Sequence, residues 1–247
     1  MFTFYEVGGK VRDEILGLVS KDVDYVAVPY ESLLSRDYTA YEMFTILETY
    51  LNNEGFRIFV THPDCFTIRA QFPANHKYQG VADFVMSRKE VGYFPGTRQP
   101  IIKPGNLNDD LKRRDFTLNA LAKDEYGRII DHFGGLEHLK NKILVTPLET
   151  GKTMLDDPLR LIRAFRFSVT KGFTISEEIM KVCSNEEVID KLEKVVSQER
   201  IREEIFKMFK EDTIKTLELL ENIKKINPRI IQIIFSNGMW LKPTTEK

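Results

Sequence analysis

The sequence predicts an α+β region followed by an all-α region. Up to about Asp131, short apolar runs follow the two-residue period of strands, with one amphipathic helix inserted among them. From Asp157 onward, apolar residues recur at the three- and four-residue spacing of helices. The chain has 247 residues, which is enough to bury a sizeable core in two or three compact parts.

The strands of the first region are predicted from apolar or alternating runs, taken in chain order. They are Phe2–Val7, Val23–Val28, Arg57–Val60, Cys65–Phe72, Val81–Met86 and Ile129–Ile130, with the helix at Ala40–Asn53. In the second region, two helical stripes are formed by Ile201, Ile205, Met208 and Phe209, and by Ile214, Leu217, Leu220 and Ile223. The strands of the first region indicate a small mixed sheet with helices. The helical stripes of the second region indicate a helix bundle.

Two interruptions of the regular pattern mark the expected hinge between the regions. Gly134-Gly135 and the segment Thr146–Gly151 both break strand and helix periodicity. We therefore expect three parts: a first domain over residues 1–135, a helical part over 136–210 and a short helical remainder over 211–247.

Charge and cysteine content narrow the class of protein. The formal net charge is −1, so any RNA binding must depend on local basic clusters such as Lys112–Arg114 or the stripe Arg160, Arg163 and Arg166. The two cysteines lie far apart, and no Cys/His spacing resembles a zinc site. No stretch has the length and hydropathy of a membrane span. We expect a cytoplasmic protein with no membrane partner.

The segment Gly8–Asp13 follows the first predicted strand and has the composition of a phosphate-binding turn. Gly8 and Gly9 permit a tight turn, and unpaired backbone N–H groups at the start of the next helix favour an anion. Arg12 adds positive charge, and Asp13 can brace the loop. Alone, such a glycine pair is more often only a turn.

Asp22 directly precedes the next predicted strand, and Asp24 lies in it; in extended backbone the two side chains project from one face, roughly 6.6 Å apart along the chain. Val23 between them points into the core. Two such carboxylates can hold Mg²⁺ ions that neutralise a triphosphate and activate an attacking hydroxyl, as in-line nucleotidyl transfer requires. Alone, an Asp-x-Asp pair is more often the solvated face of an edge strand, but the order of turn and acids favours a site.

Asp83, inside the apolar run Val81–Met86, is the candidate third carboxylate. An acid buried in a strand without a partner would cost several kcal/mol or be protonated, so its position indicates a metal or a basic partner. Arg88 is the alternative partner in a purely structural reading.

The segment Leu111–Ala120 gathers cations, an acid, a hydroxyl and an amide around apolar anchors. Arg113 and Arg114 can bind phosphate oxygens bidentately, while Asp115 can accept from ribose hydroxyls or fix Arg114 in place. Asn119 belongs to the same predicted nucleotide-binding set. The alternative is a surface helix with internal salt bridges.

Asp157 and Arg160 fall three apart at the start of a predicted helix that begins with Pro158. A carboxylate only accepts and a guanidinium only donates, so together they complement the amine and ring nitrogen of cytosine or adenine. Guanine and uracil present a carbonyl next to a ring N–H. With them, the acceptor of the protein would face an acceptor and its donor would face a donor. The alternative, an Asp cap with an i,i+3 ion pair, is the commoner meaning of such a pentapeptide alone.

Taken in order, these motifs resemble those of the class II CCA-adding enzymes, the tRNA nucleotidyltransferase and bacterial poly(A) polymerase family. The matching segments are Gly8–Asp13, Asp22–Asp24, Arg113–Ala120, Asp131–Gly135, Asp156–Arg160 and Glu199–Glu204. The resemblance runs from about Val7 to Met208 and implies a nucleotidyltransferase head, a helical neck and a truncated body.

The resemblance also implies roles for individual residues. Asp22 and Asp24 would carry two catalytic Mg²⁺ ions, with Asp83 as a third acid. Arg113, Arg114 and Asp115 would contact ribose and phosphates. Asp157 and Arg160 would select CTP or ATP, and Arg163 would reach the base or the triphosphate. Lys89–Lys103 occupies the position of the family's flexible loop, and Glu199–Glu204 would brace the neck helices.

The activity that follows is addition of C, A or both, from CTP and ATP, to the 3′ end of tRNA. Asp156 stands where the family usually has Glu, and the chain ends at Lys247, which leaves little room for the family's body and tail. We therefore expect one of three outcomes: binding limited to the acceptor end of the tRNA, a C-only or A-only activity, or tRNA binding that requires a partner subunit or a second copy of the chain. Poly(A) addition is the alternative activity, and a non-catalytic RNA- or nucleotide-binding subunit is the alternative class.

Overall fold

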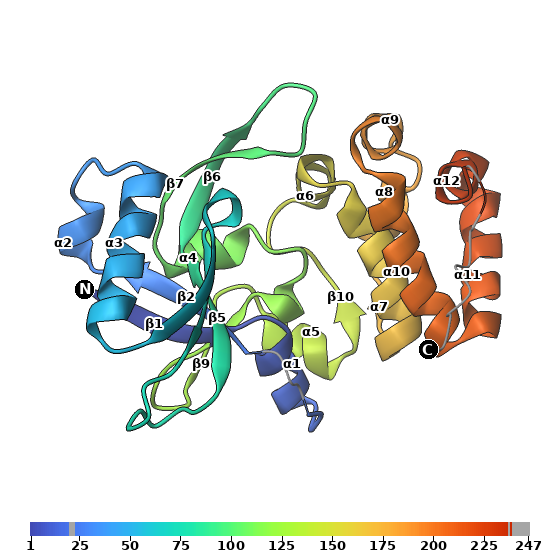
Figure 1. The fold of residues 1–247 in the computed structure, drawn as a ribbon. Coiled ribbons are helices and arrows are strands. Elements are labelled where there is room, and N and C mark those ends of the chain that lie inside the picture. Colours follow the sequence, from blue (N-terminus) through green and yellow to red (C-terminus); the bar gives the residue numbers. More distant parts are fainter. Residues whose placement is uncertain (20–22, 237, 239–247) are drawn as a thin grey trace, which may run out of the picture. The chain divides into compact units, whose positions relative to one another are not determined.

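The computed structural model describes residues 1–19, 23–236 and 238. Contacts between residues divide the chain into two compact units (Figure 1). Unit 1 contains Met1–Pro95, Gln99–Asn141 and Thr146–Leu148, and unit 2 contains Gly96–Arg98, Lys142–Val145 and the chain from Glu149 onward. The expected division at residues 135 and 210 into three functional domains stays a prediction.

Unit 1 is built on a mixed sheet of seven strands in the order β3-β4-β5-β2-β1-β8-β9. The strands are β1 (Phe2–Val7), β2 (Asp24–Pro29), β3 (Arg57–His62), β4 (Thr67–Gln71), β5 (Val81–Met86), β8 (Leu121–Lys123) and β9 (Ile129–Asp131). β2 and β5 run parallel, whereas the other neighbours are antiparallel. The predicted α+β class of this region is confirmed.

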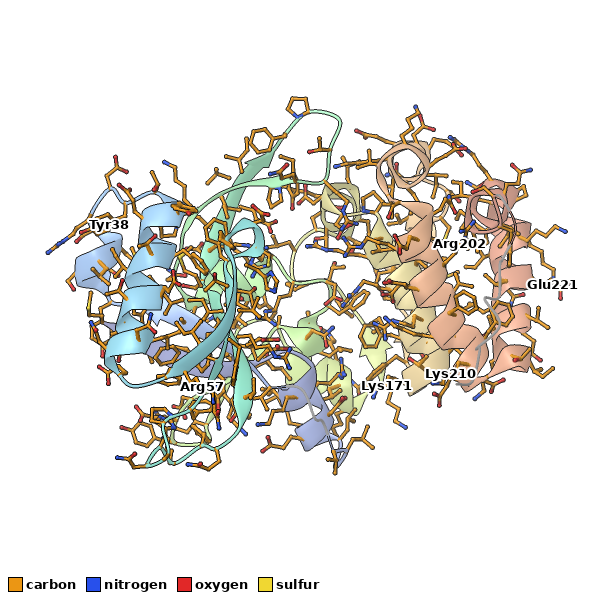
Figure 2. The ribbon with its side chains drawn as sticks, viewed as in Figure 1. Tyr38, Arg57, Lys171, Arg202, Lys210 and Glu221 are labelled. Carbon is orange, nitrogen blue, oxygen red and sulfur yellow. The ribbon has the colours of Figure 1, made fainter. Side chains whose placement is uncertain are left out.

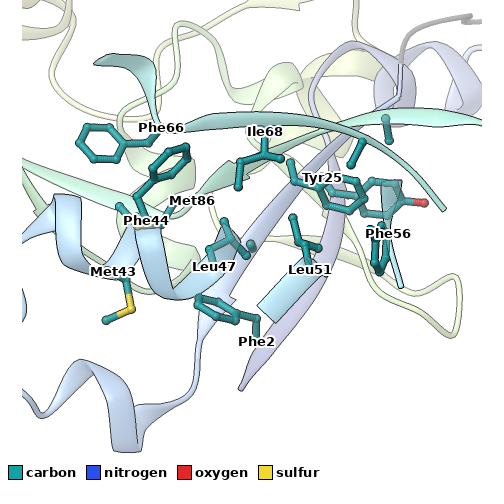
Figure 3. Packing of buried hydrophobic residues seen from close by; sticks show 14 of the residues in the cluster. Phe2, Tyr25, Met43, Phe44, Leu47, Leu51, Phe56, Phe66, Ile68 and Met86 are labelled. Atoms are coloured by element: carbon teal, nitrogen blue, oxygen red, sulfur yellow. The ribbon is translucent and has the colours of Figure 1, made fainter. Parts of the chain in front are cut away.

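One face of the sheet is covered by α3 (Ala40–Asn53), the helix that the sequence predicts with the same bounds. Thr39 and Glu42 form a reciprocal capping box that satisfies backbone N–H groups at its start. Met43, Leu47 and Leu51, spaced by four residues, are buried against the sheet (Figure 3). Burial of this apolar stripe fixes α3 on the strands.

The opposite face carries a smaller core of Val7, Val26, Leu111, Ala120 and Ala122. Side chains alternate between faces along a strand, so Tyr25 packs in the core under α3 while Val26 packs in the smaller core. Val23 also packs against the core under α3, as predicted. Asp24 therefore projects on the face that carries Val26.

The segment expected to be a loop at Lys89–Lys103 is a β-hairpin in the structure. β6 (Arg88–Tyr93) and β7 (Pro100–Pro104) pair antiparallel as a separate two-stranded sheet, with a register shift between Glu90 and Gly92. The shift and the flanking prolines disturb the alternation that identifies a strand in sequence. The residues at its tip, Gly96–Arg98, group with unit 2.

Short helices complete unit 1. They are α1 (Gly9–Ile15), α2 (Glu31–Leu34), α4 (Leu107–Lys112), α5 (Gly135–Lys140) and the 3₁₀ turns η1 (Pro63–Cys65) and η2 (Thr117–Asn119). The predicted strand from Cys65 begins only at Thr67, because Pro63 starts a 3₁₀ turn that ends with Phe66 in the left-handed region, at φ 56°.

Unit 2 is helical apart from the short parallel pair β10 (Ile143–Leu144) and β11 (Thr174–Ile175). Its helices are α6 (Thr150–Asp156), α7 (Leu159–Lys171), α8 (Glu177–Val182), α9 (Glu186–Val195), α10 (Gln198–Glu211), α11 (Thr213–Ile226) and α12 (Pro228–Ile234). α10 packs against α7, and Glu204 accepts a hydrogen bond from Arg166 across that contact. Figure 2 shows the polar side chains of these helices, among them Lys171, Lys210 and Glu221. In the described part of the chain, no helix is long and apolar enough to cross a membrane.

Candidate active site

The turn after β1 is shaped by Gly8. Its φ of 74° with ψ of −140° is a conformation available almost only to glycine. A methyl group added to Gly8 would lie 3.4 Å from Arg114 Nη1 and 3.7 Å from Asp24 Oδ2. These two distances place Gly8 between a cation and a carboxylate, and Gly9 begins α1 directly after it.

Two of the predicted acids lie next to each other. Asp24 on β2 and Asp83 on β5 are register partners on adjacent parallel strands, so both side chains project from the same face. Asp22, the remaining predicted acid, lies outside the described residues. Among the described residues, no group of three or more His, Cys, Asp or Glu side chains converges on a metal position.

Arg69 on the neighbouring strand β4 lies beside Asp83. It is the register partner of Asp83 across β4 and β5, and its Nη1 lies 3.6 Å from Asp83 Oδ2. The side chains of Arg69 and Asp83 are 55% and 33% exposed, so the ion pair is weakly held and open to exchange with a metal ion or a ligand. Arg88, the partner of Asp83 in the alternative reading, donates to the carbonyl oxygen of Cys65. Burial, followed by the nearby charge of Arg113, lowers the pKa of Arg88 to about 10.

Asp110 fixes both predicted phosphate-binding arginines. Its side chain is fully buried, and it accepts hydrogen bonds from Arg113 Nη2 at 2.5 Å and Arg114 Nη2 at 2.9 Å. Burial opposes ionisation of Asp110, but the two guanidinium groups outweigh it and hold the pKa of Asp110 below its ordinary value. The carboxylate therefore stays charged and sets the position of both cations. Arg114 also donates to the carbonyl oxygen of Asn119.

Arg12, Asp115 and Asn119 form a second buried network beside it. Arg12 Nη1 donates to Asn119 Oδ1 at 2.7 Å, and Asn119 Nδ2 donates to Asp115 Oδ1 at 2.9 Å. Arg12 also pairs with Asp13, its neighbour in α1. All three network residues are less than a tenth exposed. The network links α1 to η2, and the nucleotide contacts predicted for these residues stay predictions.

Asp157 and Arg160 lie at the start of α7 in unit 2. Asp157 Oδ1 accepts from the backbone N–H of Leu159 at 3.3 Å and pairs with Arg98 Nη1 at 3.3 Å. Arg160 donates to the carbonyl oxygen of Thr153, and Arg163 lies one turn further along α7. Asp157 therefore accepts from a backbone N–H at the start of α7 and pairs with Arg98. Base selection by Asp157 and Arg160 stays a prediction.

The sequence interpretation missed three charged residues that the structure places beside the predicted ones: Arg69, Arg98 and Asp110. For Asp110 a signal existed, because it precedes Arg113 and Arg114 by three and four residues on one helical face. Arg69 and Arg98 gave no such signal, since their partners lie 14 and 59 residues away along the chain.

Comparison with known proteins agrees with this arrangement. The family model described as the poly A polymerase head domain matches residues 4–145, which is more than half of the chain. The tRNA nucleotidyltransferase cca2 of Schizosaccharomyces pombe is 32% identical over 86% of this chain. The chain belongs to the class II CCA-adding enzyme family.

Other members of the class II CCA-adding enzyme family match as extensively. The A-adding tRNA nucleotidyltransferase of Aquifex aeolicus is 30% identical over 98% of the chain, and the CCA-adding enzyme of Francisella tularensis subsp. novicida is 32% identical over 94%. The chain spans 45%, 27% and 57% of the lengths of the Schizosaccharomyces, Aquifex and Francisella proteins.

Solved structures of class II CCA-adding enzymes share the fold. The Bacillus stearothermophilus CCA-adding enzyme in complex with CTP superposes with a TM-score of 0.67 at 25% identity, covering 96% of this chain and 50% of the other. A tRNA nucleotidyltransferase complexed with a primer tRNA and an incoming ATP analogue gives 0.64 at 27% identity, covering 97% and 61%. The predicted head and helical neck are thereby confirmed as the fold class.

Proposed function

We propose that this protein is a template-independent nucleotidyltransferase that adds C, A or both, from CTP or ATP, to the 3′ end of tRNA. The observation that carries the proposal is the register pairing of Asp24 and Asp83 on one face, beside Gly8 and Arg114. Family membership supports the same activity, because relatives of this chain are named for CCA or A addition.

In the proposed step, the 3′-hydroxyl oxygen of the RNA forms a bond to the α-phosphorus of the nucleotide. The bond from that phosphorus to the bridging oxygen breaks, pyrophosphate leaves, and the hydroxyl proton passes to solvent. Little covalent chemistry falls to the protein, so positioning and charge supply the catalysis. Arg114, which Asp110 holds next to the Gly8 turn, would bind phosphate oxygens.

The acids on this face suit Mg²⁺. Asp24 and Asp83 offer carboxylate oxygens, the ligands that Mg²⁺ prefers, and Asp22 stands two residues before Asp24 in the sequence. Two bound Mg²⁺ ions would neutralise triphosphate charge and lower the pKa of the attacking hydroxyl. Asp157 and Arg160, with Arg163 on the same helix, would select the base, and Arg98 would hold the Asp157 carboxylate in position.

The test uses the full chain with tRNAs that end before, within and after CCA, each nucleotide supplied singly, followed by sequencing of the 3′ ends. We expect one to three added nucleotides and metal-dependent release of pyrophosphate. A long ladder of A would indicate poly(A) addition, and addition of one nucleotide type alone would indicate a C-only or A-only enzyme. Binding of tRNA and nucleotide without pyrophosphate release would establish the non-catalytic alternative.

Asp24→Asn should abolish addition, a loss of at least about 10³-fold as for other groups that stabilise transition-state charge, while the circular dichroism spectrum is unchanged. Asp37→Asn, an exposed acid outside the site, is the matched control and should retain the parent rate. Turnover of Asp24→Asn within a few-fold of the parent would refute the site.

A further inference from the structure

A cavity of about 250 Å³ lies under the sheet of unit 1, on the α3 side. Tyr25 and Phe84 line it, and they directly follow Asp24 and Asp83 on the same paired strands. Because side chains alternate along a strand, the cavity lies on the face opposite to these carboxylates. It is therefore separate from the proposed active site.

The walls of this cavity are aromatic. Tyr25 contacts Phe84 with ring centroids 5.5 Å apart, Phe72 at 5.5 Å and Tyr78 at 5.9 Å. Phe56 joins the cluster from the chain that follows α3. The face of an aromatic ring carries partial negative charge and attracts cations.

The charged groups around the cavity are predominantly acidic. Four carboxylates line it, those of Glu6, Glu54, Asp124 and Glu125, against two lysines. Three of the four carboxylates are themselves paired: Glu6 with Lys123 and Lys10, Asp124 with Arg128, and Glu125 with Lys77. Glu54 caps the C-terminus of α3, where the helix dipole adds further negative potential. Among the described residues, Glu54 is the lining carboxylate without an ion pair, and its charge favours a cation at the cavity.

The structure already shows a cation in this environment, supplied by Lys77. Its ammonium lies 5.2 Å from the centre of the Tyr78 ring and 3.6 Å from the Glu125 carboxylate. It also donates to the backbone carbonyl of Glu125. The Lys77 side chain is 50% exposed, so the contact is held at the mouth and can be displaced.

The deepest acid is already held by cations of the chain. Glu6, only 3% exposed, accepts from Tyr25 at 3.0 Å and pairs with Lys123 at 2.8 Å and Lys10 at 3.6 Å. A primary ammonium that moves in from the mouth, among the aromatic walls, would lose its hydration there, because ring faces offer no strong hydrogen-bond acceptor. An alkylated ammonium needs no hydrogen bonds and is stabilised by ring faces and negative charge alone.

We propose that this aromatic cavity is a binding site for an alkylated ammonium cation, with Lys77 as the resident group that the ligand displaces. The ring face of Tyr78, which Lys77 now occupies, would receive the cation, and Glu54 would supply charge at the mouth. The site is independent of the proposed transfer reaction, and its occupancy can be measured without RNA or nucleotide.

The test is titration of the full chain with choline, followed by calorimetry and by NMR shifts of the tyrosine rings. The control ligand is 3,3-dimethylbutan-1-ol, which has the same shape without the charge. We expect saturable binding of choline and at least about threefold weaker binding of the neutral alcohol, as a cation–π contribution requires. Equal binding of the two ligands, or no binding of choline, would overturn the proposal.

Three variants locate the site. Tyr78→Leu and Glu54→Gln should each weaken choline binding by about threefold or more, whereas Lys77→Met should strengthen it because the competing ammonium is gone. Tyr126→Leu is the control, since Tyr126 is 75% exposed and outside the cavity. Equal loss of affinity in the Tyr126 variant, or unchanged affinity in the Lys77 variant, would contradict the assignment. Lys77 is exposed, so its substitution tests the site without unfolding the protein.

Discussion

At the scale of single residues, Asp110 determines where two cations of the proposed site lie. A buried carboxylate that pairs with two arginines leaves both uncompensated when it is removed. Breaking such a pair costs about 3–5 kcal/mol. We therefore expect Asp110→Asn to lower the free energy of unfolding by that amount in urea denaturation and to weaken nucleotide binding.

Asp109→Asn is the matched control for this prediction. Asp109 is the neighbouring acid of α4, where it caps the helix start and pairs with Lys112 at the surface. Its loss should cost only about 1 kcal/mol. Equal destabilisation by the two variants would show that Asp110 has no special role.

The same residue predicts a dependence of stability on pH. The pKa of Asp110 is lower in the folded chain than in the unfolded one, so its stabilising contribution is fully present above its ordinary value near 3.9. That contribution is lost as pH falls through the lower folded value. The difference in unfolding free energy between the parent and Asp110→Asn should therefore be constant from pH 5 to 7 and shrink below about pH 4. A difference that grows on acidification would contradict this sign.

Residue patterns in the sequence were sufficient to predict the strands that carry Asp24 and Asp83 and insufficient to predict which side chains lie beside these acids. Asp24 and Asp83 were identifiable because each stands in an apolar run that reads as a strand. That Arg69 would lie beside Asp83 depends on the antiparallel register of β4 and β5, which the spacing of residues along the chain does not determine.

At the scale of elements, the packing of α5 on η2 depends on Gly135. A methyl group on Gly135 would lie 2.3 Å from the Thr117 carbonyl oxygen, far inside contact distance. Alanine favours helices more than glycine does, but this clash outweighs that preference. Gly135→Ala should therefore lower the free energy of unfolding by about 1–3 kcal/mol. Chemical denaturation measures the loss.

Gly92→Ala provides the comparison within the β6–β7 hairpin. A methyl group there would meet only Ile101 Cδ1 at 3.8 Å, an ordinary contact. Its effect should be within about 0.5 kcal/mol of the parent, as for substitutions without a clash. A Gly135 variant as stable as this one would refute the close approach.

The elements were predictable where the period was long and uninterrupted, and less so elsewhere. β1, β5 and α3 have the expected bounds, because their apolar residues keep one period throughout. The hairpin of β6 and β7 was not identified as strands, since a register shift and prolines interrupt its alternation.

At the scale of the whole molecule, the net charge of −1 limits how RNA can be held. The tRNA binding proposed above must use a few local cations, so the measured affinity should depend only moderately on salt. With two to four phosphate contacts, a plot of log K against log[KCl] should have a slope of about −1.5 to −3. Fluorescence anisotropy between 50 and 400 mM KCl checks this, and a slope steeper than about −6 would indicate a broad basic surface instead.

The two strands β2 and β5 face two surfaces at once, with Asp24 and Asp83 on one and Tyr25 and Phe84 on the other. We expect a substitution at either ring to shift the backbone that positions the neighbouring acid. Laboratory evolution for altered nucleotide use should accordingly leave both rings unchanged and collect its successful mutations on helices and turns.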